Sequence, residues 1–232
     1  MKPEIKKKIK QIESPPKVVK IFSEKEIKNF IDLYKSLPTT TFNKTQQIIK
    51  KRWLQGYNKI LDSLYKEKLR VILGDFKMDN LQSENGEDFL GLFQESFAPL
   101  GIHADSGFDN NNLIYKQLLT PLSSIGGTVV FSNRWYGRST TFTIDDEELK
   151  FTPKSGQNAR SSKHLGSEGF DKEIHKKYLS HIDINNLKGL KVDLIYEWKL
   201  GETLIIDRSH IHCATSYVGD KKLGLTTFTK KE

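Results

Sequence analysis

Residues 101–107 read GIHADSG, and this stretch places a histidine and an aspartate two positions apart at the end of a β-type run. Residues i and i+2 of a strand point to the same face, so His103 and Asp105 can both point into the interior of a β-barrel. One further neutral imidazole would complete a two-histidine, one-carboxylate face for a metal ion. That third ligand has to come from another strand, distant in the sequence.

A second His-x-Asp pair, His181 and Asp183, lies in the stretch YLSHIDINNLKGL (178–190). Its leucines indicate packing near a helix end, so we interpret this pair as structural. The stretch DRSHIHCATS (207–216) offers two candidates for the third ligand, His210 and His212. About 110 positions separate His103 from them, which leaves room for four or five strands.

The order of predicted elements favours a mainly β fold with N-terminal helices. A capping box at Ser23 and Glu26 predicts a helix that ends at Leu37-Pro38, and a second, longer helix is expected over about 44–70, with Gly56 as a possible bend. Short β-type runs then follow one another, which predicts a jelly roll, that is, a cupin-like double-stranded β-helix. The expected strands are 89–93, 99–104, 113–119, 128–132, 140–144, 190–198, 203–206 and 223–229.

Length and charge suggest one domain with an extension. The 232 residues carry a net charge of +8, and residues 1–20 hold seven lysines against two glutamates. We therefore expect a basic flexible tail (1–20), a helical support layer (21–84) and a jelly-roll catalytic core (85–232) that forms one domain with that layer. The concentration of charge in the tail argues against nucleic acid as a partner. The single cysteine, the lack of a secretory signal and the lack of a membrane-length apolar run predict a cytoplasmic protein.

Lys222 follows His212 by ten residues, at the start of a predicted strand with Gly224 and Thr226 on the same face. A cation inside a barrel is costly unless it meets an anion. A dicarboxylate cosubstrate would provide that anion. The neighbouring Lys221 is the alternative to Lys222.

The motifs GxHxDSG and GxTLIxDxxxxH and the spacing to the lysine resemble the 2-oxoglutarate- and Fe(II)-dependent dioxygenases, in particular their prolyl-4-hydroxylase-like branch. The likeness covers residues 88–232. It implies that His103, Asp105 and His212 bind iron, with His210 as the alternative to His212. It also implies that Lys222, helped by Thr226, pairs with the far carboxylate of 2-oxoglutarate. Tyr115 and Gln117 share a strand face and are further candidates for binding this cosubstrate, with ordinary barrel packing as the alternative.

The resemblance implies a hydroxylase that consumes O2 and 2-oxoglutarate and releases succinate and CO2. Because Asp105 supplies a carboxylate where halogenating relatives lack one, halogenation is not expected. The sequence does not identify the substrate, a small molecule or a peptide, since specificity resides in loops such as 105–112, 133–139 and 154–172. It does not indicate the oligomeric state either. The competing hypothesis is a jelly-roll module that binds a metal or ligand without oxidation. A nucleic-acid demethylase is disfavoured because no arginine follows Arg208.

Three other groups of residues are further candidates for a place in or near the site. Arg134, Trp135 and Tyr136 bunch at a predicted strand end, where they would either bind substrate at the barrel mouth or pack a hinge. Cys213 and Trp198 are most simply interpreted as buried packing residues.

Overall fold

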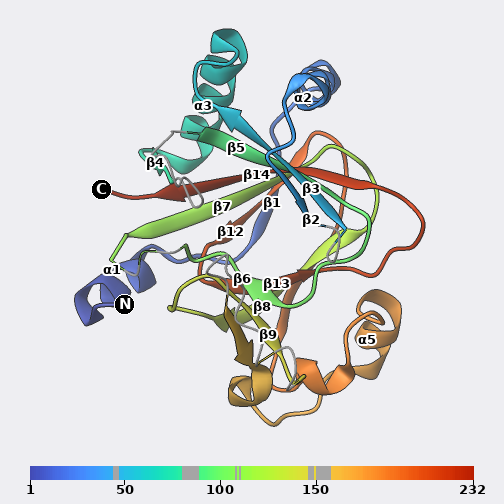
Figure 1. Cartoon of the computed structure of the whole chain (residues 1–232). Coiled ribbons are helices and arrows are strands. Elements are labelled where there is room, and N and C mark those ends of the chain that lie inside the picture. The colour runs from blue at the N-terminus through green and yellow to red at the C-terminus, as the bar shows by residue number, and fades with distance from the viewer. Residues whose placement is uncertain (44–46, 80–88, 108, 110, 146–148, 150–157) are drawn as a thin grey trace.

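The computed structural model describes residues 1–43, 47–79, 89–107, 109, 111–145, 149 and 158–232, and it contains two β-sheets (Figure 1). The larger sheet has the strand order β1 (Lys17–Lys20), β12 (Glu202–Asp207), β7 (Ile114–Pro121), β14 (Lys222–Lys230), β5 (Phe89–Ser96), β3 (Ile48–Leu54) and β2 (Thr41–Asn43), with β4 (Lys77–Met78) paired to β14. The smaller sheet has the order β10 (Asn158–Ser161), β9 (Thr140–Thr143), β6 (His103–Ala104), β13 (His210–Ala214), β8 (Gly127–Arg134) and β11 (Val192–Glu197).

The chain alternates between the two sheets as it proceeds. Strands β6, β8, β11 and β13 lie in the smaller sheet, while β5, β7, β12 and β14 lie in the larger one. Within the described residues, every strand pair is antiparallel except the parallel pair of β9 and β10. This alternation between two facing antiparallel sheets is the winding of a jelly roll, and the predicted fold class is confirmed.

Two helices, α2 (Glu24–Ser36) and α3 (Lys59–Leu73), lie on the side of the larger sheet that faces away from the smaller sheet (Figure 1). An aromatic cluster joins them to the sheet. Phe30 and Tyr65 meet edge to face with ring centroids 5.6 Å apart, and Trp53 of β3 lies 5.0 Å from Tyr65. The Tyr65 hydroxyl is hydrogen-bonded to Thr227 of β14 at 2.7 Å. These helices therefore hold the outer face of the larger sheet, and its inner face is left free to line a cavity.

The helix predicted at Ser23 is confirmed, but the long helix over 44–70 is wrong. Ser23 and Glu26 form both hydrogen bonds of the capping box at the start of α2. Residues 48–54 form β3, which pairs with β5, and the helix α3 starts only at Lys59. Gly56, with φ of 91°, makes the turn between them, and the Asn58 side chain caps α3. Strand pairing has thus overridden an apolar spacing that also fits a helix.

Most predicted strands are present, with two informative differences. Of the predicted strand 99–104, only His103–Ala104 is paired, as β6. Strand β13 was not predicted, although polar and apolar residues alternate over its first four positions; all five of its residues are buried. In the predicted surface excursion 154–172, residues 158–161 form β10 and 162–165 a 3₁₀ helix, while 154–157 lie outside the described residues.

The N-terminal residues differ from the expected flexible tail. Residues Pro3–Ile12 form helix α1 and bury Ile9, and β1 pairs with β12. The backbone N–H of Ser14 donates to the Asp207 carboxylate at 2.9 Å, which attaches this segment to the barrel. The lysines of α1 nevertheless remain exposed, as their charge requires. The domain boundary placed at 84/85 stays a prediction.

The remaining helical elements are short. Helix α5 covers Lys172–Tyr178, and the 3₁₀ helices η1 (Ser162–Leu165) and η2 (Ile184–Leu187) flank it. Among the helices of the described residues, none combines the length and the apolar character needed to cross a bilayer.

We expect Asp62→Ala to lower the free energy of unfolding by about 2–3 kcal/mol. The buried Asp62 carboxylate accepts hydrogen bonds from Trp53 Nε1 at 2.9 Å and from the Gly56 N–H at 2.6 Å, so its removal leaves a buried donor unpaired. Urea unfolding measures the loss. The exposed Glu67 on the same helix provides the control, because Glu67→Ala should change stability by less than about 0.5 kcal/mol. Equal effects in the two variants would contradict this account.

Candidate metal centre

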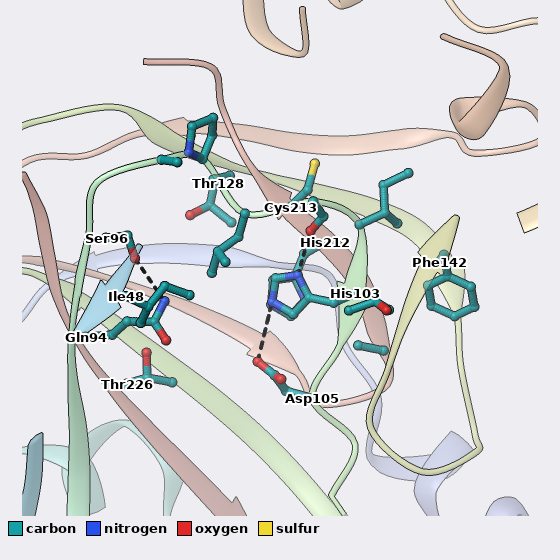
Figure 2. A pocket seen from close by; sticks show the side chains of 18 of the residues that line it. Ile48, Gln94, Ser96, His103, Asp105, Thr128, Phe142, His212, Cys213 and Thr226 are labelled. Carbon is teal, nitrogen blue, oxygen red and sulfur yellow. Dashed lines mark hydrogen bonds and ion pairs between the residues drawn. The ribbon is translucent and has the colours of Figure 1, made fainter. Parts of the chain in front are cut away.

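His103 and His212 are brought together by the pairing of β6 with β13, in which they are direct cross-strand partners. Their rings lie 4.2 Å apart between centroids. The Nε2 atoms of His103 and His212 lie 3.7 and 3.6 Å from the same carboxylate oxygen, Oδ2 of Asp105. One ligand atom from each residue therefore lies within 4.8 Å of the others, and the three side chains point toward one another (Figure 2). This cluster could hold a metal ion.

Backbone carbonyls fix how both imidazoles present their nitrogens. Nδ1 of His103 lies 2.8 Å from the carbonyl oxygen of Gly101, and Nδ1 of His212 lies 3.2 Å from that of His210. Since a carbonyl only accepts hydrogen bonds, each Nδ1 must carry the proton. The lone pair of each ring is then on Nε2, which faces Asp105, as a metal ligand requires.

The environment also sets the protonation states that a metal needs. Burial and, to a smaller extent, the neighbouring His212 lower the pKa of His103 to about 4, so its ring is neutral near pH 7. Burial by itself would raise the pKa of Asp105, but His103, His212 and the Gln117 amide outweigh it and hold this pKa below its ordinary value. A neutral imidazole at His103 and an ionised carboxylate at Asp105 are therefore present at neutral pH, as metal binding requires.

Two residues hold Asp105 in place through hydrogen bonds. The Gln117 side-chain amide donates to Oδ2 of Asp105 at 2.9 Å, and Arg208 Nε donates to the Asp105 backbone carbonyl at 3.2 Å. Arg208 is completely buried and forms an ion pair with Asp79. Sequence reasoning missed Arg208 and Asp79, since nothing in their local sequence indicates that they meet across 129 positions.

The three side chains lie in a cavity of about 800 Å³ between the two sheets. Lys222 lines its far side and is only 5% exposed. Its ammonium group donates to the carbonyl of Gly127 and lies 4.0 Å from the ring centroid of Trp198. Within the described residues no carboxylate forms an ion pair with Lys222, and burial lowers its pKa to about 7. An unpaired buried cation of this kind is a site for an anion.

Thr226 and Gln117 line the same cavity, but Tyr115 does not. The Tyr115 hydroxyl donates to the carbonyl of Leu73 at 3.3 Å, and its ring packs against the cluster beneath α3. The structure thus separates Tyr115 from Gln117, although their positions predict a shared face. Gln117 contacts Asp105, and its amide oxygen is buried without a partner.

The structure places the alternative candidates that the sequence left open at different positions relative to the cavity. His210 is fully buried, with Nδ1 accepting from the Asp207 N–H at 3.0 Å, and it lies outside the cluster of three ligands. Lys221 is exposed and lies 3.5 Å from Glu95, whereas Lys222 points into the cavity. His181 is hydrogen-bonded to Ser216, and Asp183 caps η2, which agrees with structural roles even though both line the cavity rim.

The polar and aromatic group at 134–136 packs rather than lining the cavity. Arg134 binds Asp207, Trp135 donates to the carbonyl of Arg138, and Tyr136 donates to Glu13. Cys213 and Trp198 are buried as expected but also line the cavity, and Trp198 Nε1 donates to Thr128 at 3.0 Å. Trp198 therefore forms part of the lysine site.

The fold and the site together define a double-stranded β-helix with two histidines and one carboxylate at its centre. Neither a scan of protein-family models nor a search of curated proteins finds a match. Solved structures do match. HygX of Streptomyces hygroscopicus, with nickel, 2-oxoglutarate and hygromycin B bound, is 11% identical, with a TM-score of 0.51 over 99% of this chain and 87% of that one.

Two further solved structures are similar to this chain. The non-heme α-ketoglutarate-dependent carbocyclase SnoK is 7% identical, with a TM-score of 0.51 over 100% of this chain and 84% of that one. The epimerase SnoN, in complex with Fe3+, α-ketoglutarate and nogalamycin RO, is 8% identical, with a TM-score of 0.51 over 98% and 84%. At such low identity these likenesses show that the chain shares the fold of these proteins.

Gln117→Leu should weaken binding of Mn(II) about tenfold, because a partner that orients a ligating carboxylate typically contributes this much to affinity. Calorimetric titration of the metal-free protein measures the change. Gln94→Leu is the matched control, since Gln94 lines the same cavity but donates to Ser96 rather than to a ligand. Unchanged affinity in Gln117→Leu, or the same loss in both variants, would show that Gln117 does not support the site.

Proposed function

We propose that this protein is an Fe(II)- and 2-oxoglutarate-dependent dioxygenase that hydroxylates a substrate C–H bond and releases succinate and CO2. The observation that carries the proposal is the presence, in one cavity, of three converging candidate ligands and a buried lysine that has no counterion among the described residues. Neither the three ligands alone nor the buried lysine alone would specify the reaction. A metal triad fits many enzymes, and a buried lysine fits any anion site.

The residues present fit Fe(II) and the cosubstrate. Two neutral imidazoles and one carboxylate are the ligand set of non-heme Fe(II) oxygenases, and they leave coordination positions open. His103, Asp105 and His212 would hold the iron. Lys222 would pair with the far carboxylate of 2-oxoglutarate, and the Thr226 hydroxyl, which faces the same cavity, would donate a hydrogen bond to it.

The protein's own contribution is binding and orientation. Bound iron would supply the activation of O2 and the oxidative decarboxylation of 2-oxoglutarate. Gln117 keeps the Asp105 carboxylate aligned, Arg208 fixes its backbone, and Trp198 holds the Lys222 side chain beneath its ring plane. These contacts are present before any ligand arrives, so little reorganisation is needed when the cosubstrate binds.

The substrate is proposed only as a class. HygX binds hygromycin B in its structure, and the sequence motifs resemble the prolyl-4-hydroxylase-like branch, so a small molecule or a peptide residue is expected here. The carboxylate of Asp105 occupies the position that halogenating relatives leave free, which favours hydroxylation. The net charge of +8 does not argue for nucleic acid, because the lysines of α1 lie outside the cavity.

The proposal is tested by succinate formation from 2-oxoglutarate in the presence of Fe(II) and O2 and by the anaerobic metal-to-ligand absorption band. Both signals should appear in the wild-type protein. His212→Ala should abolish both, whereas Lys221→Ala should change neither, since Lys221 is exposed outside the cavity. A wild-type protein that binds metal but gives neither signal would instead be the competing non-oxidative jelly-roll binding module.

Binding of 2-oxoglutarate at pH 8 should take up close to one proton, about 0.9. The pKa of Lys222 is about 7 because of burial, so the amine is mostly neutral at pH 8 in the free protein. A bound carboxylate favours the charged form and raises this pKa, and a proton is therefore taken up. Calorimetry of the Mn(II)-loaded protein in two buffers with different ionisation enthalpies measures the uptake.

Two Lys222 variants provide the controls. Lys222→Arg should bind the cosubstrate with almost no proton uptake, because a guanidinium is charged throughout this pH range. Lys222→Ala should weaken binding of 2-oxoglutarate more than binding of metal. Uptake that persists in Lys222→Arg would assign the proton to another group and contradict the anchoring role.

A further inference from the structure

The cavity contains a second lysine, Lys50, on strand β3. Lys50 is the cross-strand partner of Gln94 in β5, and Gln94 is in turn the partner of Gly224 in β14. Gln94 and Gly224 both line the cavity, so this row of the larger sheet faces inward. Lys222 belongs to the adjacent inward row, where its partner in β5 is Ser96. Two strand spacings across the sheet and one two-residue step along it separate the two lysines, so they arise about 12 Å apart.

Lys50 has no counterion of its own. Among the described residues, its ammonium group takes part in no hydrogen bond and no ion pair, although the side chain is partly buried. Asp105 is the carboxylate whose charge reaches it, and this attraction opposes the lowering of the Lys50 pKa by burial. Asp145 and Asp183 also line the cavity, from the side of the smaller sheet, where Asp183 accepts from the Asn185 N–H.

The balance of charge near the metal centre calls for one more anion. A divalent ion bound by Asp105 leaves a charge of +1, and Lys222 and Lys50 each add one more. A bound 2-oxoglutarate dianion would compensate two of these three charges. On the larger-sheet side of the cavity the charge of Lys50 then has no partner among the described residues, since Asp145 and Asp183 lie on the side of the smaller sheet, and an unpaired buried charge is unfavourable.

We propose that Lys50 binds a carboxylate of the hydroxylated substrate and so makes the enzyme selective for acidic molecules. This inference rests on the proposed function and deepens it. A single carboxylate matches the one remaining charge, whereas a phosphate monoester would exceed it. Because β3 comes from the N-terminal part of the chain, this specificity residue lies outside the strands that carry the metal ligands.

Probe binding tests the proposal without knowledge of the natural substrate. Mn(II)-loaded protein saturated with 2-oxoglutarate is mixed with benzoate or with its neutral isostere benzamide, and the paramagnetic relaxation of the probe protons is measured by NMR. Benzoate should relax strongly and benzamide weakly. In Lys50→Gln the dissociation constant of benzoate should rise about tenfold, while Lys50→Arg should keep most of the affinity.

Lys51→Gln is the matched control, because Lys51 lies on the same strand but points to the opposite face, where it donates to the carbonyl of Tyr34. It should bind benzoate like the wild type. Equal relaxation by both probes, or unchanged benzoate binding in Lys50→Gln, would overturn the proposal. Stronger Lys50-dependent relaxation of phenyl phosphate would overturn the choice of a carboxylate.

Cosubstrate binding separates this inference from the proposed function. Lys50→Gln should bind 2-oxoglutarate with the wild-type affinity in calorimetry. A large loss there would make Lys50 a cosubstrate residue and would overturn its assignment to the substrate. If the wild-type protein itself binds neither Mn(II) nor 2-oxoglutarate, the proposed function fails, and Lys50-dependent binding of benzoate to the metal-free protein would still support an acidic ligand.

Discussion

The pairing of β6 with β13 is the constraint on which the candidate site depends. The pairing is short and places His103 directly opposite His212. Two residues far apart in the sequence thus become neighbours whose side chains point to the same face of the sheet. A slip of one residue would turn one imidazole to the other face of the sheet. Neighbouring pairs hold the register on both sides, because β13 also pairs with β8 and β6 with β9.

The sequence predicted the candidate metal ligands from strand spacing and from a family resemblance. His103 and Asp105 have strand spacing, and the ten-residue interval from His212 to Lys222 favoured these two residues, while His210 and Lys221 stayed open as alternatives until the structure separated them. The structure places these residues as the spacing requires, although their roles in catalysis stay a prediction. The overall jelly roll followed from repeated short β-runs with turn residues between them.

What the sequence could not predict depends on distant contacts. Residues 48–54 carry an apolar spacing that suits a helix, and only pairing with β5 makes them a strand. Tyr115 and Gln117 were expected on one face, but the Tyr115 hydroxyl reaches the carbonyl of Leu73, away from the cavity that Gln117 lines. The ion pair of Arg208 with Asp79 joins residues with no shared pattern. The charged N-terminal residues resembled a free tail because their anchors, Asp207 and Arg134, lie in the other half of the chain.

The attachment of the N-terminal segment has a consequence for protein engineering. Asp207 receives hydrogen bonds from Ser14, Lys116 and Arg134, and the next residue, Arg208, holds the backbone of Asp105. Removing the first sixteen residues to reduce the basic charge would expose Asp207 and the side chains bonded to it. Asp207 directly precedes Arg208, the residue that holds the Asp105 backbone. A shortened form prepared for crystallisation would therefore represent the full-length protein poorly, even though all three candidate ligands would still be present.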